Sequence, residues 1–161
     1  MPKTGYTLSE TALASEASAK TIRNWIDRDL VPFTKADQDE PDGWHRFSAR
    51  TVLLFALTQR LVRHGLPVGD AVRLVETSRR LSPKGTLWRH RNTPAAAIPA
   101  AFANVTLFVW RTDDGEWRSV EGDPASDPDL PDTFIWVDLE RVAATVAAAL
   151  EDLGGDASQK S

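Results

Sequence analysis

The sequence predicts an α+β protein of two parts, and three observations support this prediction. Two short helices with polar capping residues follow one another within residues 7–30. Two runs rich in β-branched and aromatic residues flank Asp114-Gly115, a dipeptide typical of hairpin turns. A helical apolar stripe occupies residues 139–153. We therefore expect a mainly helical domain with a small hairpin over residues 6–83, followed over residues 86–154 by three antiparallel strands and a C-terminal helix.

The composition limits the classes of protein to which the chain can belong. Its 161 residues carry a formal net charge of −4, and 42% are hydrophobic and 26% charged, as in ordinary globular proteins. The absence of cysteine excludes disulfides and thiolate metal sites. The longest uninterrupted apolar run, Val52–Leu57, is too short to span a membrane, and the first residues lack an apolar signal core. We therefore expect a cytoplasmic protein without a membrane segment.

The charge is unevenly distributed along the chain. Residues 1–83 hold 12 Lys and Arg against 10 Asp and Glu, a net charge of +2, whereas residues 84–161 hold 7 against 13, a net charge of −6. So small a basic excess predicts loose binding to non-specific nucleic acid, because phosphate contacts dominate that affinity. Tight binding to nucleic acid would require two copies of the chain or good contacts to bases.

Residues 7–30 have the pattern of two short helices joined by a tight turn. Thr7 and Glu10 form a capping box for the first helix, and Ser18 caps the second, over residues 19–28. The second helix has one apolar face, formed by Ile22, Trp25 and Ile26. This spacing is typical of a helix-turn-helix that reads DNA, and a plain helical hairpin with a solvated charged face is the alternative.

The chain resembles the MerR-type winged helix-turn-helix family over about residues 6–81. The motifs that carry the resemblance stand in the family's order: Tyr6-Thr7, Thr21-Ile22-Arg23 with Trp25, Leu30-Val31, Gly43-Trp44-His45-Arg46-Phe47-Ser48 and Gly65-Leu66-Pro67-Val68. Departures occur at Asp29, His45 and Pro67, where the family usually has Gly, Arg and Ser. The resemblance implies a transcriptional regulator that binds double-stranded DNA through its second helix.

The second helix supplies most of the residues expected to contact DNA. Arg23 can bond a guanine edge and Asn24 an adenine edge in the major groove, whereas Lys20 and Arg28 are expected to meet phosphates. The family resemblance adds Arg50 as a phosphate contact, for which a solvated arginine is the alternative. The full set of predicted DNA-binding residues is Lys20, Thr21, Arg23, Asn24, Arg28, Lys35, His45, Arg46 and Arg50.

Residues 33–47 are expected to form the wing, a hairpin with a long acidic tip. Lys35, His45 and Arg46 lie at its base and would meet the flanking DNA backbone, because phosphates repel an acidic tip. The acids of the tip are Asp37, Asp39, Glu40 and Asp42. A loop that avoids DNA is the alternative.

Two further helices are expected to complete the first part. Ser48 caps the third helix, which should end at Gly65, and the fourth should run from Val68 to Leu81. No long heptad run follows, so the coiled coil through which many MerR-type proteins dimerise is not expected. Residues 86–104 fit a strand, a short helix or an extended linker, and the sequence does not decide between them.

Residues 105–137 contain the three expected strands, which cover residues 105–111, 116–120 and 133–137. A two-residue turn at Asp114-Gly115 would place Trp117 opposite Thr112, with Trp110 as its diagonal neighbour on the same face. The two tryptophans would then pack a small core or, alternatively, form the floor of a ligand pocket.

The final helix is expected to begin after Asp138 and to end at Gly154. Its apolar stripe has the spacing 3, 4, 3, 4 and consists of Leu139, Val142, Val146, Ala149 and Leu153. Such a stripe suits a coiled-coil seam of two heptads, and packing on the three strands is the alternative.

The sequence contains no catalytic or cofactor-binding motif, so we expect neither an enzyme nor a bound cofactor or metal. The expected function is sequence-specific binding of double-stranded DNA by a homodimeric transcriptional regulator. An excisionase-like or phage architectural DNA-binding protein is one alternative, because the run Thr21–Ile26 resembles that group as well. An adaptor whose acidic second part binds a protein partner is another, and the weak basic excess supports it.

Overall fold

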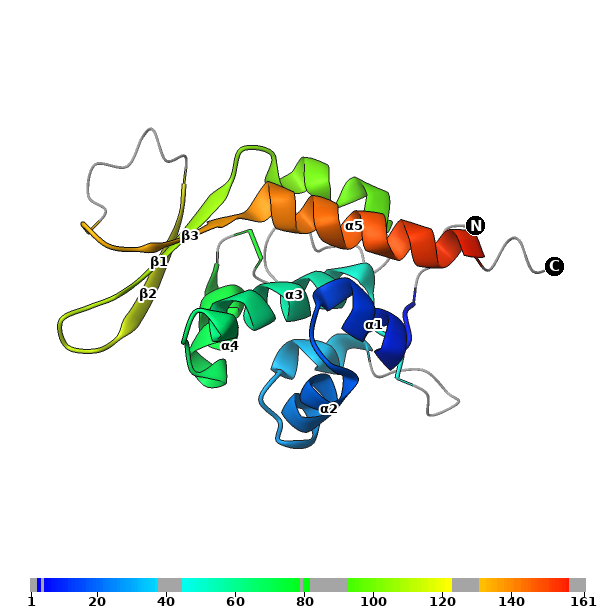
Figure 1. Ribbon diagram of the computed structural model, residues 1–161, viewed down its shortest axis with the longest axis horizontal. Helices are drawn as coiled ribbons and strands as arrows, with labels where there is room; N and C mark the ends of the chain where they lie inside the picture. Colours follow the sequence, from blue (N-terminus) through cyan, green and yellow to red (C-terminus); the bar gives the residue numbers. More distant parts are fainter. Residues whose placement is uncertain are drawn as a thin grey trace.

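The computed structural model describes residues 3, 5–37, 45–78, 80–81, 93–122 and 131–156. Figure 1 shows a helical body with a small sheet at its left-hand end, α2 at the lower edge and α5 along the top of α3. The elements in chain order are α1 (Leu8–Ser15), α2 (Ala19–Asp27), the 3-10 helix η1 (Pro32–Asp37), α3 (Ala49–Arg63), α4 (Val68–Thr77), the 3-10 helices η3 (Ala95–Ala97) and η4 (Pro99–Phe102), β1 (Thr106–Arg111), β2 (Trp117–Gly122), β3 (Ile135–Asp138) and α5 (Leu139–Asp156).

Helices α1 and α2 begin where the predicted caps lie. The Thr7 hydroxyl accepts from the Glu10 N–H while the Glu10 carboxylate accepts from the Thr7 N–H, which confirms the capping box. The Ser18 hydroxyl accepts from the N–H of Thr21 at 3.0 Å. Between the helices, Glu16 adopts a left-handed backbone conformation with φ of 59°, and this conformation makes the turn.

Helix α3 is the centre of the core. Phe55 is fully buried, and its ring contacts those of Trp25, Phe33 and Phe47, at centroid distances of 6.4, 5.1 and 5.6 Å. Such aromatic pairs contribute on the order of 1 kcal/mol each beyond the burial of their area. Ser48 caps α3, and the chain leaves the helix through Gly65 with φ of 96°, as expected.

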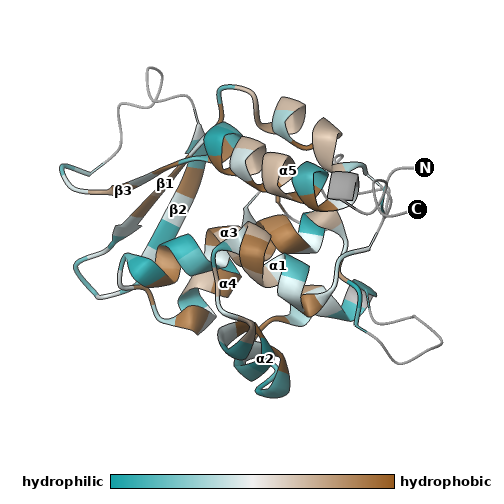
Figure 2. Cartoon of the chain, turned by 45° about the vertical axis from the view of Figure 1, so that its right-hand side comes forward, coloured by the Kyte–Doolittle hydropathy of each residue, from teal (hydrophilic) through white to brown (hydrophobic). Residues whose placement is uncertain are grey.

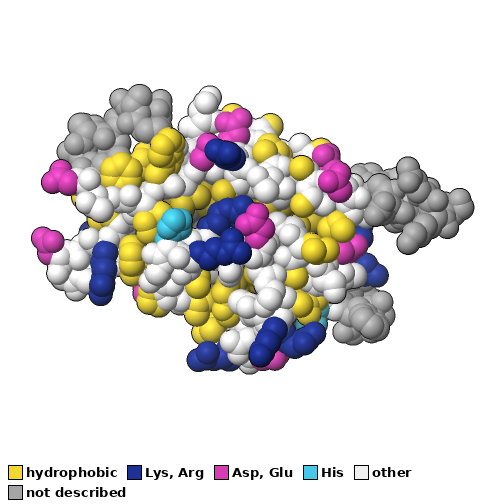
Figure 3. All heavy atoms as spheres, in the orientation of Figure 1, with side chains coloured by type: hydrophobic (Ala, Val, Ile, Leu, Met, Phe, Trp, Pro, Cys, Tyr) yellow, Lys and Arg dark blue, Asp and Glu magenta, His cyan; other side chains and the backbone are white. Residues whose placement is uncertain are grey.

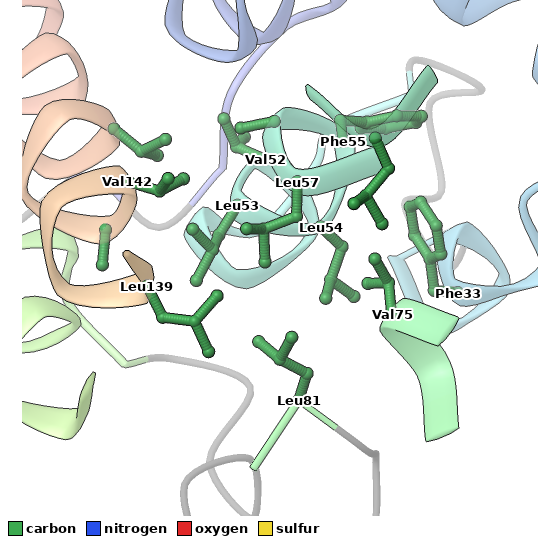
Figure 4. Packing of buried hydrophobic residues seen from close by; sticks show 14 of the residues in the cluster. Phe33, Val52, Leu53, Leu54, Phe55, Leu57, Val75, Leu81, Leu139 and Val142 are labelled. Atoms are coloured by element: carbon green, nitrogen blue, oxygen red, sulfur yellow. The ribbon is translucent and has the colours of Figure 1, made fainter. Parts of the chain in front are cut away.

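Helix α4 is shorter than expected, because it ends at Thr77 rather than at Leu81. Ser78 has a ψ of 131°, which ends the helix. Leu81 is nevertheless fully buried, and it points from outside the helix towards Leu54 of α3 (Figure 4). The apolar pattern therefore predicted the burial of Leu81 correctly, but the prediction that the helix continues to Leu81 was wrong.

The region expected to form the wing differs from a simple hairpin. Residues 32–37 form the 3-10 helix η1, because Pro32 supplies a helical φ at its start and the buried Phe33 packs on Phe55. On the other side of the expected hairpin, Phe47 pairs with Tyr6, through N–H···O bonds of 2.9 and 2.8 Å. The expected acidic tip, apart from Asp37, lies in residues 38–44, outside the described residues.

The sheet is antiparallel with the strand order β2-β1-β3, as the expected fold class requires. Its hairpin register was predicted wrongly by one residue. Arg111 lies opposite Trp117 and Trp110 opposite Arg118, so the two tryptophans lie on opposite faces and form neither a common core nor the floor of a pocket. The cause is a three-residue loop closed by the N–H of Thr112 on the carbonyl of Glu116 at 2.8 Å, with Gly115 at φ of 87°.

Helix α5 packs against α1 and α3 on one side and against η3 and η4 on the other. Its apolar stripe therefore faces the core of its own chain. It does not form a coiled-coil seam between two copies, and it does not pack mainly on the strands. Leu139 and Val142 point towards Leu53 of α3 (Figure 4). The helix also continues through Gly154 to Asp156.

A single hydrophobic cluster extends from Tyr6 to Leu150 and includes side chains from both expected parts of the chain. The division into two domains near residue 83 remains a prediction, but the two parts share their core. In the part of the chain that the structure describes, no helix has the length and apolar character needed to cross a membrane.

Candidate nucleic-acid interface

Helix α2 presents a polar face to solvent while its other face is buried. Ile22 and Trp25 are buried, whereas Lys20, Arg23 and Asn24 are exposed. The helix projects at the lower edge of the molecule and is mostly hydrophilic on its outer side (Figures 1 and 2). Figure 3 shows Lys and Arg side chains gathered along this lower edge. The predicted reading helix is thus accessible along the side that carries its basic residues.

A hollow of about 420 Å³ lies beside α2. Arg23 on α2 and the predicted wing residues His45 and Arg46 line it together, although 22 positions separate Arg23 from His45 in the sequence. The remaining lining residues are Thr7, Leu8 and Ser9 at the start of α1, Ile26 and Asp27 on α2, and Phe47. The fold therefore brings three of the predicted DNA-binding residues to one concave surface.

The pairing of Phe47 with Tyr6 fixes the position of the two wing residues. The His45 ring stacks on Phe47 at a centroid distance of 6.4 Å and an interplanar angle of 11°. Arg46 lies against Gly5, where an added Cβ would approach the Arg46 Cβ to 3.2 Å. Both side chains are exposed, so they are held at the rim of the hollow while their polar ends face solvent.

The start of α1 contributes a positive potential to the hollow, because the N–H groups of a helix N-terminus point outward. An acid, Glu10, lies in this first turn and pairs with Lys3. Burial acts to raise the pKa of Glu10, but hydrogen bonds from Lys3 and from the Thr7 backbone outweigh it, so the pKa lies below its ordinary value. Glu10 is therefore a carboxylate whose charge Lys3 compensates.

The C-terminal end of α2 holds a second group of predicted residues. Arg28 caps the helix and is exposed, and Asp29 follows with φ of 53°. Lys35 on η1 pairs with Asp29 at 3.0 Å, with both side chains more than half exposed. The positive φ explains why a glycine suits this position in the resembled family.

Thr21 and Arg50 are less available than the other predicted residues. The Thr21 hydroxyl shares a hydrogen bond of 2.8 Å with the capping hydroxyl of Ser18. Arg50 is half-buried, and the charges of Asp37 and Glu76 act on it. Burial lowers the pKa of Arg50, and the two acids act in the opposite direction.

Sequence reasoning missed the contact that secures the helix-turn-helix. Arg63, at the end of α3, donates to the Glu16 carbonyl at 2.8 Å and to its carboxylate at 3.2 Å. Arg60 adds an ion pair with the same carboxylate at 3.8 Å. The two arginines hold the turn that sets the angle between α1 and α2. The sequence gives no indication that Glu16 and Arg63, which are 47 positions apart, form a pair. The only available signal was the presence of a charged residue, Glu16, in the turn.

A helix-turn-helix with an exposed polar second helix, beside a hollow that Arg23 and Arg46 line, is typical of DNA-binding regulators. Residues 6–78, just under half of the chain, match the model of the MerR HTH family regulatory protein. A comparison with curated proteins finds no match to this chain. The N-terminal part is therefore a MerR-type helix-turn-helix, which belongs to a family of DNA-binding regulators rather than of enzymes, and residues beyond 78 lie outside the match.

Proposed function

We propose that the protein is a transcriptional regulator that reads a specific sequence of double-stranded DNA with α2 in the major groove. The observation that carries this proposal is the accessible face of α2, where Lys20, Arg23 and Asn24 are exposed. It lies beside a hollow that Arg23 and Arg46 line. A helix presented in this way fits the width of the major groove. Helices α3 and α4 favour a regulator over an excisionase-like protein, since they continue the fold beyond the wing region.

The exposed residues have separate roles in this proposal. Arg23 bonds the O6 and N7 acceptors of a guanine, and Asn24 bonds the N6 and N7 of an adenine. Lys20 and Arg28 contact phosphates, which position the protein without specifying sequence. His45 and Arg46, together with the start of α1, receive the DNA backbone that passes beside α2.

The regulator acts as a homodimer in this proposal. The nine residues of α2 reach few base pairs, and the N-terminal half has a basic excess of only two charges. Two copies on an inverted repeat would double both the base contacts and the phosphate contacts.

Selection of bound sequences from a random duplex pool tests the proposal, with the full chain and two variants. Arg23→Ala should lose about 1–3 kcal/mol of specific binding and relax the preference at one position. Lys20→Ala should weaken binding to all sequences alike and reduce the salt slope by about one charge. If Arg23→Ala retains both the affinity and the preferred sequence, α2 is not the reading helix.

A further inference from the structure

The outer edge of β3 has unpaired backbone groups that can be identified from the pairing of β1. The N–H of Thr112 bonds the carbonyl of Glu116, so the even-numbered residues of β1 bond β2. The N–H of Leu139 bonds the carbonyl of Val105 at 3.1 Å, so the odd-numbered residues bond β3. Ile135 and Val137 therefore point their backbone groups at β1, and the N–H and carbonyl of Trp136 point outward.

Helix α4 and the residues after it contact the opposite edge of the sheet, along β2. Arg73 of α4 donates to the outward carbonyl of Trp117 at 2.9 Å. Glu121 accepts from the Ser78 hydroxyl and from the N–H of Arg80. Among the described residues, no backbone hydrogen bond reaches the outer edge of β3. Among the described residues, α4 lies beside the outer edge of β2, so the edge along β3 is the more open of the two to an added strand.

Exposed aromatic side chains accompany this edge. Three large hydrophobic side chains are exposed among the described residues, and two of them, Phe134 at 39% and Trp136 at 63%, belong to β3 and the residue before it. Both lie over the face of the sheet opposite to α5. Trp136 donates from its ring N–H to the Thr106 hydroxyl at 3.2 Å, and Phe134 packs edge-on against Phe108 at 5.3 Å. The two rings are thus held in place along the sheet.

We propose that β3 pairs antiparallel with β3 of a second copy of this chain, about a two-fold axis at Trp136. The resulting sheet has six strands in the order β2-β1-β3-β3-β1-β2. Trp136 lies opposite its own counterpart, Ile135 opposite Val137, and Phe134 opposite Asp138. The outward N–H and carbonyl of Trp136 then bond those of the second Trp136, as a hydrogen-bonded antiparallel pair requires. Four aromatic side chains meet across the axis on one face.

Two observations select this register and this partner. An axis at Ile135 would place Asp132 opposite Asp138 of the other copy and would turn inward-pointing backbone groups to the interface, so like charges and hydrogen bonding both disfavour it. The outward N–H and carbonyl of Trp136 are one donor and one acceptor, and a second Trp136 related by a two-fold axis satisfies both, so a second copy of the chain is the occupant that this edge fits.

The surroundings of the edge agree with this arrangement. Leu139, Val142 and Val146 of the α5 stripe are buried within their own chain and cannot form a coiled-coil seam, so a dimer must use another surface. The sheet lies at the left-hand end and α2 at the lower edge in Figure 1, so pairing through β3 leaves α2 uncovered. The inference deepens the dimer in the proposed function and does not depend on which DNA sequence α2 reads.

Sedimentation equilibrium of the full chain without DNA tests the interface. The unaltered chain should have twice the mass of one copy, and Trp136→Lys should raise the dissociation constant by about tenfold or more, since a charge would face its own copy across the axis. Leu13→Lys is the matched control, because Leu13 is 70% exposed on α1 and far from the sheet in sequence. It should leave the dissociation constant unchanged. Circular dichroism verifies that both variants are folded.

Cross-linking gives a second and independent test, because the chain contains no cysteine. Opposed residues of a hydrogen-bonded pair have Cα atoms about 5.5 Å apart, which lies within the range that a disulfide spans. Trp136→Cys should therefore form a covalent dimer on mild oxidation, and Leu13→Cys should not. A monomeric unaltered chain, or a dimer that Trp136→Lys leaves unchanged, overturns the inference. Since DNA is absent, either result leaves the assignment of α2 untouched, and a dimer that fails to bind DNA would overturn only that assignment.

Discussion

Replacing Leu150 by alanine should destabilise the helix-turn-helix, although the helix to which Leu150 belongs lies outside it. Leu150 is 1% exposed on α5 and belongs to the cluster that also contains Phe55 of α3. A Leu→Ala change at a closed core position costs about 2–5 kcal/mol, through lost burial and the cavity that remains. For a chain of this size, about 3 kcal/mol corresponds to a fall in Tm of roughly 6–12 °C. The same change at Leu13, which is 70% exposed, should cost less than about 0.5 kcal/mol.

Native-state hydrogen exchange resolves where the lost stability appears. If α5 and the helix-turn-helix share one core, the amides of α3 and α5 should lose protection by similar free energies in Leu150→Ala. If they form separate domains, the amides of α5 should lose protection while those of α3 retain theirs. The second result would refute the reasoning from the shared cluster, and it would support independent domains on either side of residue 83.

Three further predictions concern the helix-turn-helix. Asp29→Ala should be about 1 kcal/mol less stable in urea than Asp29→Gly, because both lose the pair with Lys35 but only glycine accepts a φ of 53° without strain, and equal midpoints would contradict this. Arg63→Ala and Arg73→Ala should cost similar stability, at most about 1 kcal/mol, because each side chain is half exposed and makes one ion pair and one bond to a carbonyl. Only Arg63→Ala should weaken specific DNA binding, several-fold in a titration, because it releases the turn before α2, and an equal effect of both variants would exclude a positioning role. The pKa of Glu10 is lowered in the folded state, so its contribution to stability is present above its ordinary value of 4.5 and is lost as the pH falls through the folded value. Glu10→Gln should therefore unfold with a weaker dependence on pH below about 4.5 in acid titrations than the unaltered chain, and parallel curves would show that Glu10 contributes nothing.

Local signals in the sequence were sufficient for most elements of the fold. Hydroxyl caps at Ser18 and Ser48 and the capping box at Thr7 predicted the starts of three helices, because each acts on backbone groups within three residues. The prediction of the hairpin register was wrong because a two-residue loop and a three-residue loop can both form at the same residues. A two-residue loop needs a positive φ at Asp114 as well as at Gly115, whereas the observed three-residue loop needs it only at Gly115.

Contacts between residues that are far apart in the sequence could not be predicted from local sequence patterns. The stripe of α5 has a spacing that suits any apolar surface, and only the three-dimensional structure shows that α1 and α3 provide that surface. The same holds for the candidate site. Arg23, Asn24 and Lys20 were predicted to be exposed from the periodicity of one helix, but the meeting of Arg23 with His45 and Arg46 depends on the pairing of Phe47 with Tyr6.

The packing of α5 has a consequence for the order of events during synthesis. The helix-turn-helix leaves the ribosome early, but the apolar surfaces of α1 and α3 that α5 covers have no cover until α5 has been made. In a nascent chain that stops before α5, those apolar surfaces would stay exposed, and chaperones and proteases could bind them. The helix-turn-helix would therefore reach its final stability only after α5 has been translated, so that chains without α5 would compete poorly for whatever the helix-turn-helix binds.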